Sequence, residues 1–242
     1  MIRRHNKTAR QGTASNSSET GSAFFYILLA VVLFGTLSFT VARSMRGGQI
    51  NALSDRKAEL AASEILDGAQ KIQHAIDYLR TNGCSENDIS METPDGLNVN
   101  PASPVDESCH IFSPKGGNII WNTPQTGVEN NNVWRASSHS HISNIGTTKA
   151  ELILYLPSIN KSVCEKINKS ANIIRDTIPS ENGYAFNGEW DGSFNDGSPH
   201  FISCDGVSPA GACNNKTFAC IESDVSNAPH ENYIFYYVLI ER

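Results

Sequence analysis

The longest uncharged stretch of the chain lies near its start, where residues 23–41 carry no charged side chain. The hydroxyl residues Thr36, Ser38 and Thr40 all fall near its end. At about 1.5 Å per residue, a helix of this length reaches roughly 28 Å, close to the thickness of the bilayer hydrocarbon core. A core helix would normally carry a polar face, so the pattern predicts a membrane span at 23–41. The alternative is a signal sequence cut near residue 42, although the apolar run exceeds a usual signal core of roughly 7–15 residues.

Helical periodicity continues beyond this span. Apolar residues recur at three- and four-residue steps, Lys57 fills one of the slots, and charged residues occupy the opposite face. Gly47-Gly48 would allow a kink, and Gly83 with Arg80 in the last turn marks a helix end. We therefore expect one long helix over 22–82 that packs along a sheet of the same chain, a generic stalk or coiled coil being the alternative. Its apolar stripe comprises Ile50, Leu53, Leu60, Ala61, Ile65, Ala69, Ile72, Ile76 and Leu79, of which Leu60, Ile65, Ile72, Ile76 and Leu79 should be buried against the sheet.

After residue 83 the pattern changes to short runs typical of strands. Residues 109–112 and 119–122 flank a turn that contains two glycines, which predicts a β-hairpin. The stretches 84–108 and 122–148 are rich in Asn, Ser and Pro, so we expect exposed loops there.

The second half of the head contains stronger strand signals. Glu151–Leu156 is a nearly continuous apolar run that ends before Pro157, typical of a buried strand, and Ser158 can then cap a short helix. Residues 217–222 and 233–240 predict a final pair of strands, the second of them central or well covered. The fold class predicted is α+β: a long N-terminal helix on an antiparallel sheet, with a head of residues 83–242 and disulfide-bonded loops.

Charge and cysteine distribution indicate the orientation in a membrane. Residues 1–21 form a basic leader of net charge +3, whereas the whole chain carries −6. Arg43 and Arg46 follow the span and weaken the rule that positive flanks stay in the cytoplasm. All six cysteines lie after the span, and an even number on one side is typical of disulfides in an oxidising compartment. The head is therefore expected outside the cytoplasm.

The pairing of the cysteines is open by sequence, because six cysteines allow 15 connectivities. Cys84–Cys109 is the first choice, since it would join the end of the long helix to the next strand and contribute roughly 3 kcal/mol by closing a loop of about 24 residues. The other four pair either as Cys164–Cys220 with Cys204–Cys213, which the spacing slightly favours, or as Cys164–Cys204 with Cys213–Cys220.

Motifs that carry chemistry are few. The acidic balance, with a pI near 5.6, argues against nucleic-acid binding. Ser138-His139-Ser140-His141 has no third metal ligand nearby and is typical of a solvated loop, while the segment from Asp191 to Gly197 resembles the start of a calcium loop but lacks its glycine and its final acid. Cys164 is better explained as a disulfide partner than as a nucleophile. No cofactor, metal or enzymatic activity is expected.

A short basic leader ending in glycine, a helix that is apolar and then amphipathic, and a disulfide-bonded β-rich head resemble the type IV pilins and type II secretion pseudopilins. The resemblance implies that a dedicated peptidase cuts after Gly21, so that the mature chain begins at Ser22, and that mature helices bundle into a filament core. The family usually places a basic residue before the glycine, Phe first in the mature chain and Glu fifth, where this chain has Thr20, Ser22 and Tyr26. That glutamate is thought to pair with a neighbour's N-terminus, and some minor pilins and tip pseudopilins lack it.

We therefore interpret the chain as a pilin-like subunit, of the minor class, anchored in the inner membrane with a periplasmic or extracellular head. The partners implied are other pilin-like subunits through the N-terminal helix, the leader peptidase and the inner membrane. A single-pass membrane-anchored binding or adhesion module that never polymerises is the alternative, and an anchored envelope hydrolase is a third hypothesis. Leader cleavage separates the first two, because a simple anchor keeps residues 1–21.

Overall fold

The computed structural model describes residues 20–124, 126–129, 133–173, 177–182, 186, 188–204, 211–224 and 232–242, with the backbone alone for 20–22, 41–52, 182, 224 and 232. The chain divides into two compact units, Met1–Ala52 and Leu53–Arg242. Most of the basic leader, residues 1–19, lies outside the described residues.

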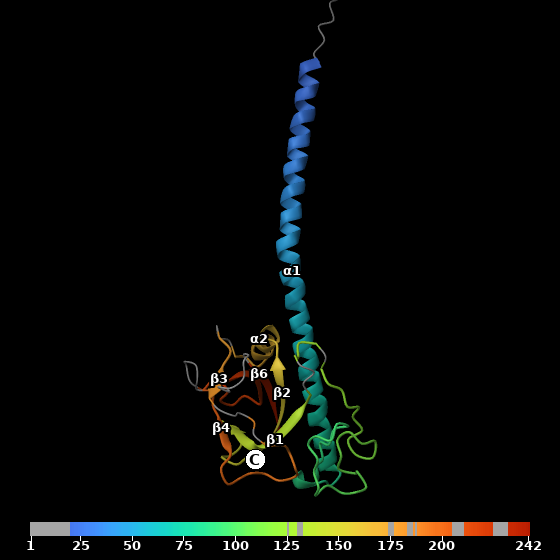
Figure 1. Cartoon of the computed structure of the whole chain (residues 1–242), viewed down its shortest axis with the longest axis vertical. Helices are drawn as coiled ribbons and strands as arrows, with labels where there is room; N and C mark the ends of the chain where they lie inside the picture. The colour runs from blue at the N-terminus through green and yellow to red at the C-terminus, as the bar shows by residue number, and fades with distance from the viewer. Residues whose placement is uncertain are drawn as a thin grey trace, which may run out of the picture. The chain divides into compact units, whose positions relative to one another are not determined.

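A single helix, α1 (Thr20–Thr81), covers the apolar and the amphipathic stretches (Figure 1). The helix continues through Gly47 and Gly48, where the sequence would have allowed a kink. The first unit therefore consists, in its described part, of the apolar half of α1.

The C-terminal end of α1 is fixed by local hydrogen bonds. Gly83 has a φ of +98°, a left-handed conformation that glycine adopts without a steric penalty. The amide of Cys84 donates to the carbonyl of Leu79 over 3.1 Å, and that of Gly83 donates to the carbonyl of Arg80 over 3.1 Å. This is the Schellman arrangement, and the helix ends where the glycine predicted it.

The second unit contains a six-stranded sheet in the order β3-β5-β6-β2-β1-β4. The four central strands are antiparallel, but β4 is parallel to β1 and β3 is parallel to β5, so the expected antiparallel sheet is in fact mixed. Both parallel strands are only three residues long and are reached by long connections, which parallel pairing requires. The elements after α1 are η1 (Glu86–Asp88), β1 (Arg135–Ile142), β2 (Glu151–Ile159), α2 (Lys161–Ser170), β3 (Ser180–Asn182), β4 (His200–Ile202), β5 (Phe218–Asp224) and β6 (Asn232–Ile240).

The last two predicted strands are present as β5 and β6, and β6 lies between β5 and β2 at the centre of the sheet. The prediction that β2 ends before Pro157 is wrong. The register gains one residue in β2 between Leu156 and Ile159, a bulge that accommodates a residue without an N–H group. Helix α2 begins after Asn160, two residues later than the expected cap at Ser158.

The predicted hairpin at 109–122 does not form. The amide of Ser90 donates to the carbonyl of Cys109 over 3.0 Å, and the amide of Ile111 donates to the carbonyl of Ser90 over 3.0 Å, so this segment pairs with residue 90 and then turns. The expected exposed loops are also wrong in part. Within 84–108, Asn98 is buried and its Oδ1 accepts the amide of Ala136 over 3.0 Å. Within 122–148, residues 135–142 form strand β1.

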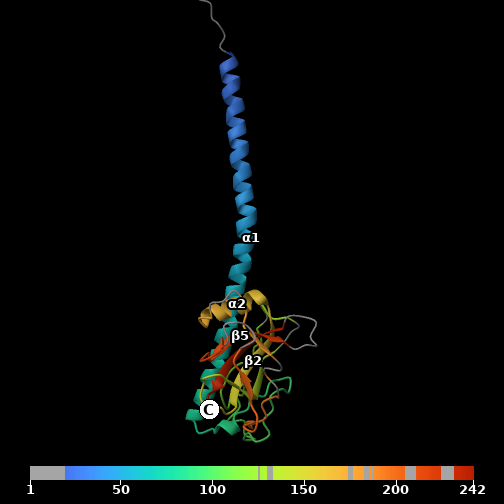
Figure 2. The same ribbon diagram turned by 90° about the vertical axis from the view of Figure 1, so that its left-hand side faces the viewer.

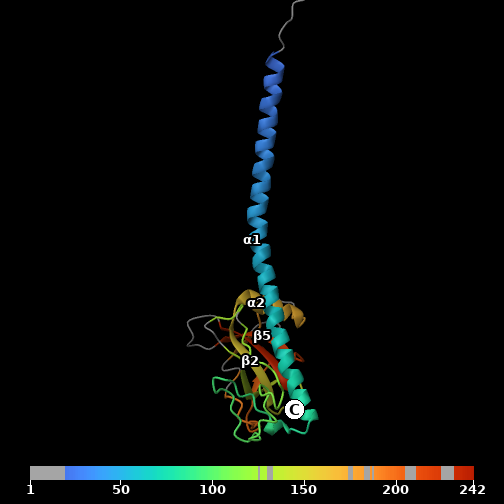
Figure 3. The same cartoon turned by 90° about the vertical axis from the view of Figure 1, so that its right-hand side faces the viewer.

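One face of the sheet and the second half of α1 contribute to the same buried cluster. The strands lie beside this half of the helix in both side views (Figures 2 and 3). Leu53 and Leu60 depart from the predicted stripe, because they are 57% and 71% exposed, and Leu60 is the one that was expected to be buried against the sheet. At about 100° per residue it lies roughly 140° around the helix from Ile65, so small residues take its place in the contact. The buried positions of α1 are Ala58, Ala61, Ala62, Ile65, Ala69, Ile72, Ala75, Ile76 and Leu79.

Three disulfides fasten the head. Cys84, just after α1, pairs with Cys109, and Cys204, just after β4, pairs with Cys213. The third joins α2 to β5. Since it pairs Cys164 with Cys220, the connectivity is the first of the two sets that the spacing left open.

The other face of the sheet contributes to a second buried cluster, which includes Cys204. Glu181 of β3 accepts the amides of Ser203 and Cys204 over 3.1 and 2.6 Å. Strands β3 and β4 stand at opposite ends of the sheet order, so this side chain links the two edges.

Candidate functional site: an apolar helix surface and a groove

The apolar half of α1 is the first candidate site. The segment Ala23–Thr40 is long and apolar enough to cross a membrane, by length and composition, and none of it is buried within the described chain. A signal sequence would pass the same test. The hydroxyls of Thr36 and Thr40 donate to the carbonyls of Leu33 and Leu37, over 2.9 and 2.8 Å. The hydroxyl donors of both threonines are therefore satisfied within the helix, as an apolar environment requires.

The exposed aromatic and aliphatic side chains extend around the segment rather than along one stripe. Phe24, Tyr26, Leu33, Phe34 and Phe39 are each 60% or more exposed. An apolar surface of this extent favours lipid or other apolar helices over water.

The predicted cleavage site lies at the start of this helix. Thr20, Gly21 and Ser22 have helical backbone, and their side chains lie outside the described set. Tyr26, at the position of the family's glutamate, is 65% exposed, and its ring centroid lies 6.2 Å from that of Phe25. Cleavage between Gly21 and Ser22 stays a prediction.

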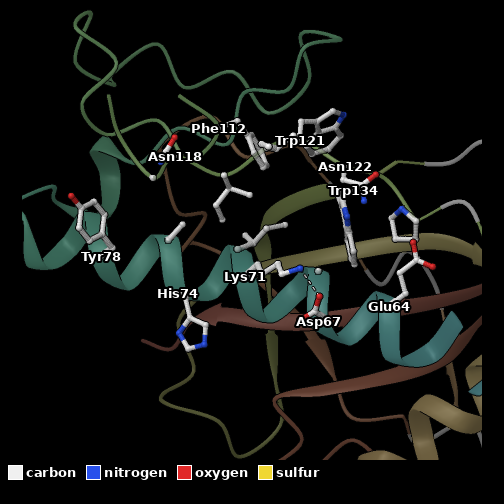
Figure 4. A pocket seen from close by; sticks show the side chains of 17 residues that line it. Glu64, Asp67, Lys71, His74, Tyr78, Phe112, Asn118, Trp121, Asn122 and Trp134 are labelled. Carbon is white, nitrogen blue, oxygen red and sulfur yellow. Dashed lines mark ion pairs between the residues drawn. The ribbon is translucent and has the colours of Figure 1, made fainter. Parts of the chain in front are cut away.

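The second candidate is a groove in the Leu53–Arg242 unit, with a volume of about 880 Å³ (Figure 4). We call it the helix–loop groove, because α1 forms one wall and the segment 112–124 with Trp134 forms the other. The helix wall carries charged residues, and Lys71 Nζ lies 2.6 Å from Asp67 Oδ2. His74 also lines the groove, but its ring points away from the loop (Figure 4).

The loop wall of the helix–loop groove is aromatic. Phe112 and Trp121 are half-buried and meet edge to face, with ring centroids 4.8 Å apart. Trp134 is almost fully buried, and a Cβ added to Gly68 would lie 3.2 Å from its ring, so a larger residue at this position would require the ring to shift by a few tenths of an ångström. The sequence analysis did not predict this groove. The feature that could have indicated it is the pair Trp121 and Trp134 in a stretch otherwise rich in Asn.

His139 and His141, which were compared with a metal-binding motif, lie on strand β1 and not on the solvated loop that was expected. His141 is buried, with its ring 5.0 Å from that of Phe201. Burial, with a smaller contribution from the charge of His200, lowers the pKa of His141. Among the described residues, no group of three or more His, Cys, Asp or Glu side chains is placed to hold a metal ion.

In the segment that resembles a calcium loop, the carboxylates already bond to donors of the protein itself. Asp191 Oδ1 accepts both the hydroxyl and the amide of Ser193, and the hydroxyl bond lowers the pKa of this carboxyl. Asp196 Oδ1 lies 2.9 Å from the guanidinium of Arg242. Cys164 is held in its disulfide and is not a free thiol.

Strand β2 begins with a buried carboxyl, that of Glu151, which the sequence analysis did not identify as a candidate site residue. Glu151 is fully buried, and its Oε2 accepts the amide of Ile142 over 3.0 Å. Its Oε1 has no hydrogen-bond partner among the described residues. Burial raises the pKa of Glu151 to about 8, opposed by the bond from Ile142 and assisted by the charge of Glu241.

Comparisons of the chain with protein-family models, with curated proteins and with solved structures find no match.

Proposed function

We propose that this protein is a pilin-like structural subunit, of the minor class, of a type IV pilus or type II secretion-type filament. In this proposal the 23–41 segment anchors the subunit in the inner membrane before assembly. It then packs among the corresponding helices of other subunits. The head is presented in the periplasm or outside the cell.

The observation that carries the proposal is the order of parts along α1. An apolar half with exposed side chains is followed, in one helix, by a half whose buried positions belong to the core of a disulfide-bonded head. Extraction of the apolar half from lipid would be offset by burial of the same surface against neighbouring helices. Three disulfides on the far side of the span favour an oxidising compartment for the head.

Leader processing is the experiment that tests the proposal. The intact mass of protein purified from cells that express the peptidase should be lower by the mass of residues 1–21, because cleavage falls after Gly21. Gly21→Ala should retain the leader, and Gly35→Ala, within the span, should be processed like the native chain. A mature protein that begins at Met1 would reject the proposal.

The alternative is a single-pass anchored binding module that does not polymerise. It is favoured by Tyr26, which stands where the family carries the glutamate that pairs subunits. In this case the leader is kept, and cross-linking in membranes finds no contact between the apolar helices of two copies.

A further inference from the structure

We propose that the helix–loop groove binds a neutral oligosaccharide, with its pyranose rings stacked on the aromatic wall and its hydroxyls on the polar wall. The volume of about 880 Å³ falls within the range of roughly 300–1,000 Å³ that is usual for small-ligand sites. This inference does not depend on the pilin-like function, because both the processed and the unprocessed chain contain the groove.

The two walls differ in the way that the two sides of a sugar ring differ. A pyranose has C–H faces that pack on aromatic rings and an edge of hydroxyls that needs donors and acceptors. The half-buried ring of Trp121, which meets Phe112 edge to face, supplies an aromatic surface. Asp67 and Lys71 supply a carboxylate and an ammonium on the helix wall (Figure 4). Both side chains are more than half exposed.

The loop wall adds polar groups at its rim. Asn118 and Asn122 are exposed and flank the aromatic surface. Each amide both donates and accepts, as a hydroxyl ligand requires. Ile120, between them, is 89% exposed, so the rim also offers apolar contact.

The charges of the groove favour a neutral ligand. Asp67 and Lys71 neutralise each other at 2.6 Å, which leaves the exposed carboxylate of Glu64 as the remaining charge of the wall. An anionic polysaccharide would meet this carboxylate without a compensating cation.

A peptide that adds a strand to the loop fits less well. The amides of Gly117, Asn118 and Ile119 already donate to the carbonyls of His110, Ser113 and Ile111, over 2.9, 2.9 and 3.2 Å. These three successive donors are therefore occupied, and strand addition depends on free main-chain donors.

Titration of the full-length chain, in a detergent without a sugar headgroup, tests the proposal. The probes are cellohexaose and chitohexaose, with hyaluronan hexasaccharide as the anionic comparison and tryptophan fluorescence as the readout. We expect saturable binding of at least one neutral probe with a Kd below about 1 mM, and weaker binding of the anionic one. Trp121→Ala should weaken binding at least tenfold, whereas Phe201→Ala, an exposed aromatic on β4 that does not line the groove, should leave it unchanged.

Asp67→Ala, at an exposed position, supplies a second variant if Trp121→Ala lowers the melting temperature, and it should also weaken binding. The proposal is overturned if neither neutral probe gives saturable binding, if Asp67→Ala and a folded Trp121→Ala bind as the native chain does, or if the groove takes up apolar peptides and no sugar. Retention of the leader, by contrast, would reject the pilin-like function and leave this result untouched.

Discussion

Replacement of Glu151 by Gln should remove a large part of the pH dependence of stability. Burial raises the pKa of this carboxyl from 4.5 to about 8, so the folded protein keeps it protonated at a pH where the unfolded chain has released the proton. A raised pKa contributes stability that is complete below the unfolded value and is lost as the pH rises through the folded value. The interval from 4.5 to about 8 corresponds to roughly 5 kcal/mol of unfolding free energy.

The measurement is urea denaturation of the full-length protein and of Glu151→Gln at about pH 5 and about pH 9. The native chain should lose several kcal/mol more than the variant between the two pH values. A constant cost of burying the amide cancels in this comparison, and so does the titration of His141, which both proteins share. Glu92→Gln, at an exposed position, should follow the native profile. Parallel profiles of the native chain and Glu151→Gln would refute the reasoning.

Two further substitutions probe the core. Ile72→Asp places an unpaired charge among buried residues and should lower the unfolding free energy by roughly 3–5 kcal/mol, whereas Leu60→Asp, on the exposed face of α1, should change it by about 0.5 kcal/mol or less in thermal or urea unfolding. Asn168→Ala should lower the unfolding free energy by roughly 2–4 kcal/mol in the same assay, because the side chain bonds both the amide and the carbonyl of Cys220 over 2.8 Å. Lys169→Ala, at an exposed position of the same helix, should be near neutral. Equal losses in the two variants would contradict this role of Asn168.

The elements that could be predicted from the sequence are those whose apolar residues follow one period. The helical stripe of α1 and the apolar runs of β2 and β6 have this property, and all three elements are present. Strand β1 could not be predicted because it has almost no apolar pattern. Its residues Ser137, Ser138 and Ser140 are fully buried, and a serine-rich stretch in isolation indicates a loop.

The candidate sites divide in the same way. The apolar surface of α1 follows from composition alone, since an uncharged stretch of this length is legible in any sequence. The helix–loop groove brings α1 to a segment some fifty residues later, and Gly68 on one wall lies close to the ring of Trp134 on the other. Nothing in local periodicity reports such a contact. The raised pKa of Glu151 is likewise a property of burial, which a charged residue at a strand start does not reveal.

The disulfide between Cys84 and Cys109 has a mechanical consequence. If tension is applied to the chain ends, the covalent path of force passes across this bond, and the 24 residues between the two cysteines carry no load while it is intact. Fully extended, these residues would span roughly 80 Å. Reduction of the disulfide would add this length to the chain under the same tension. The Cys164–Cys220 bond shields the 55 residues between its cysteines in the same way. While both bonds are intact, the stretched head therefore lengthens less than it would after its cysteines are reduced.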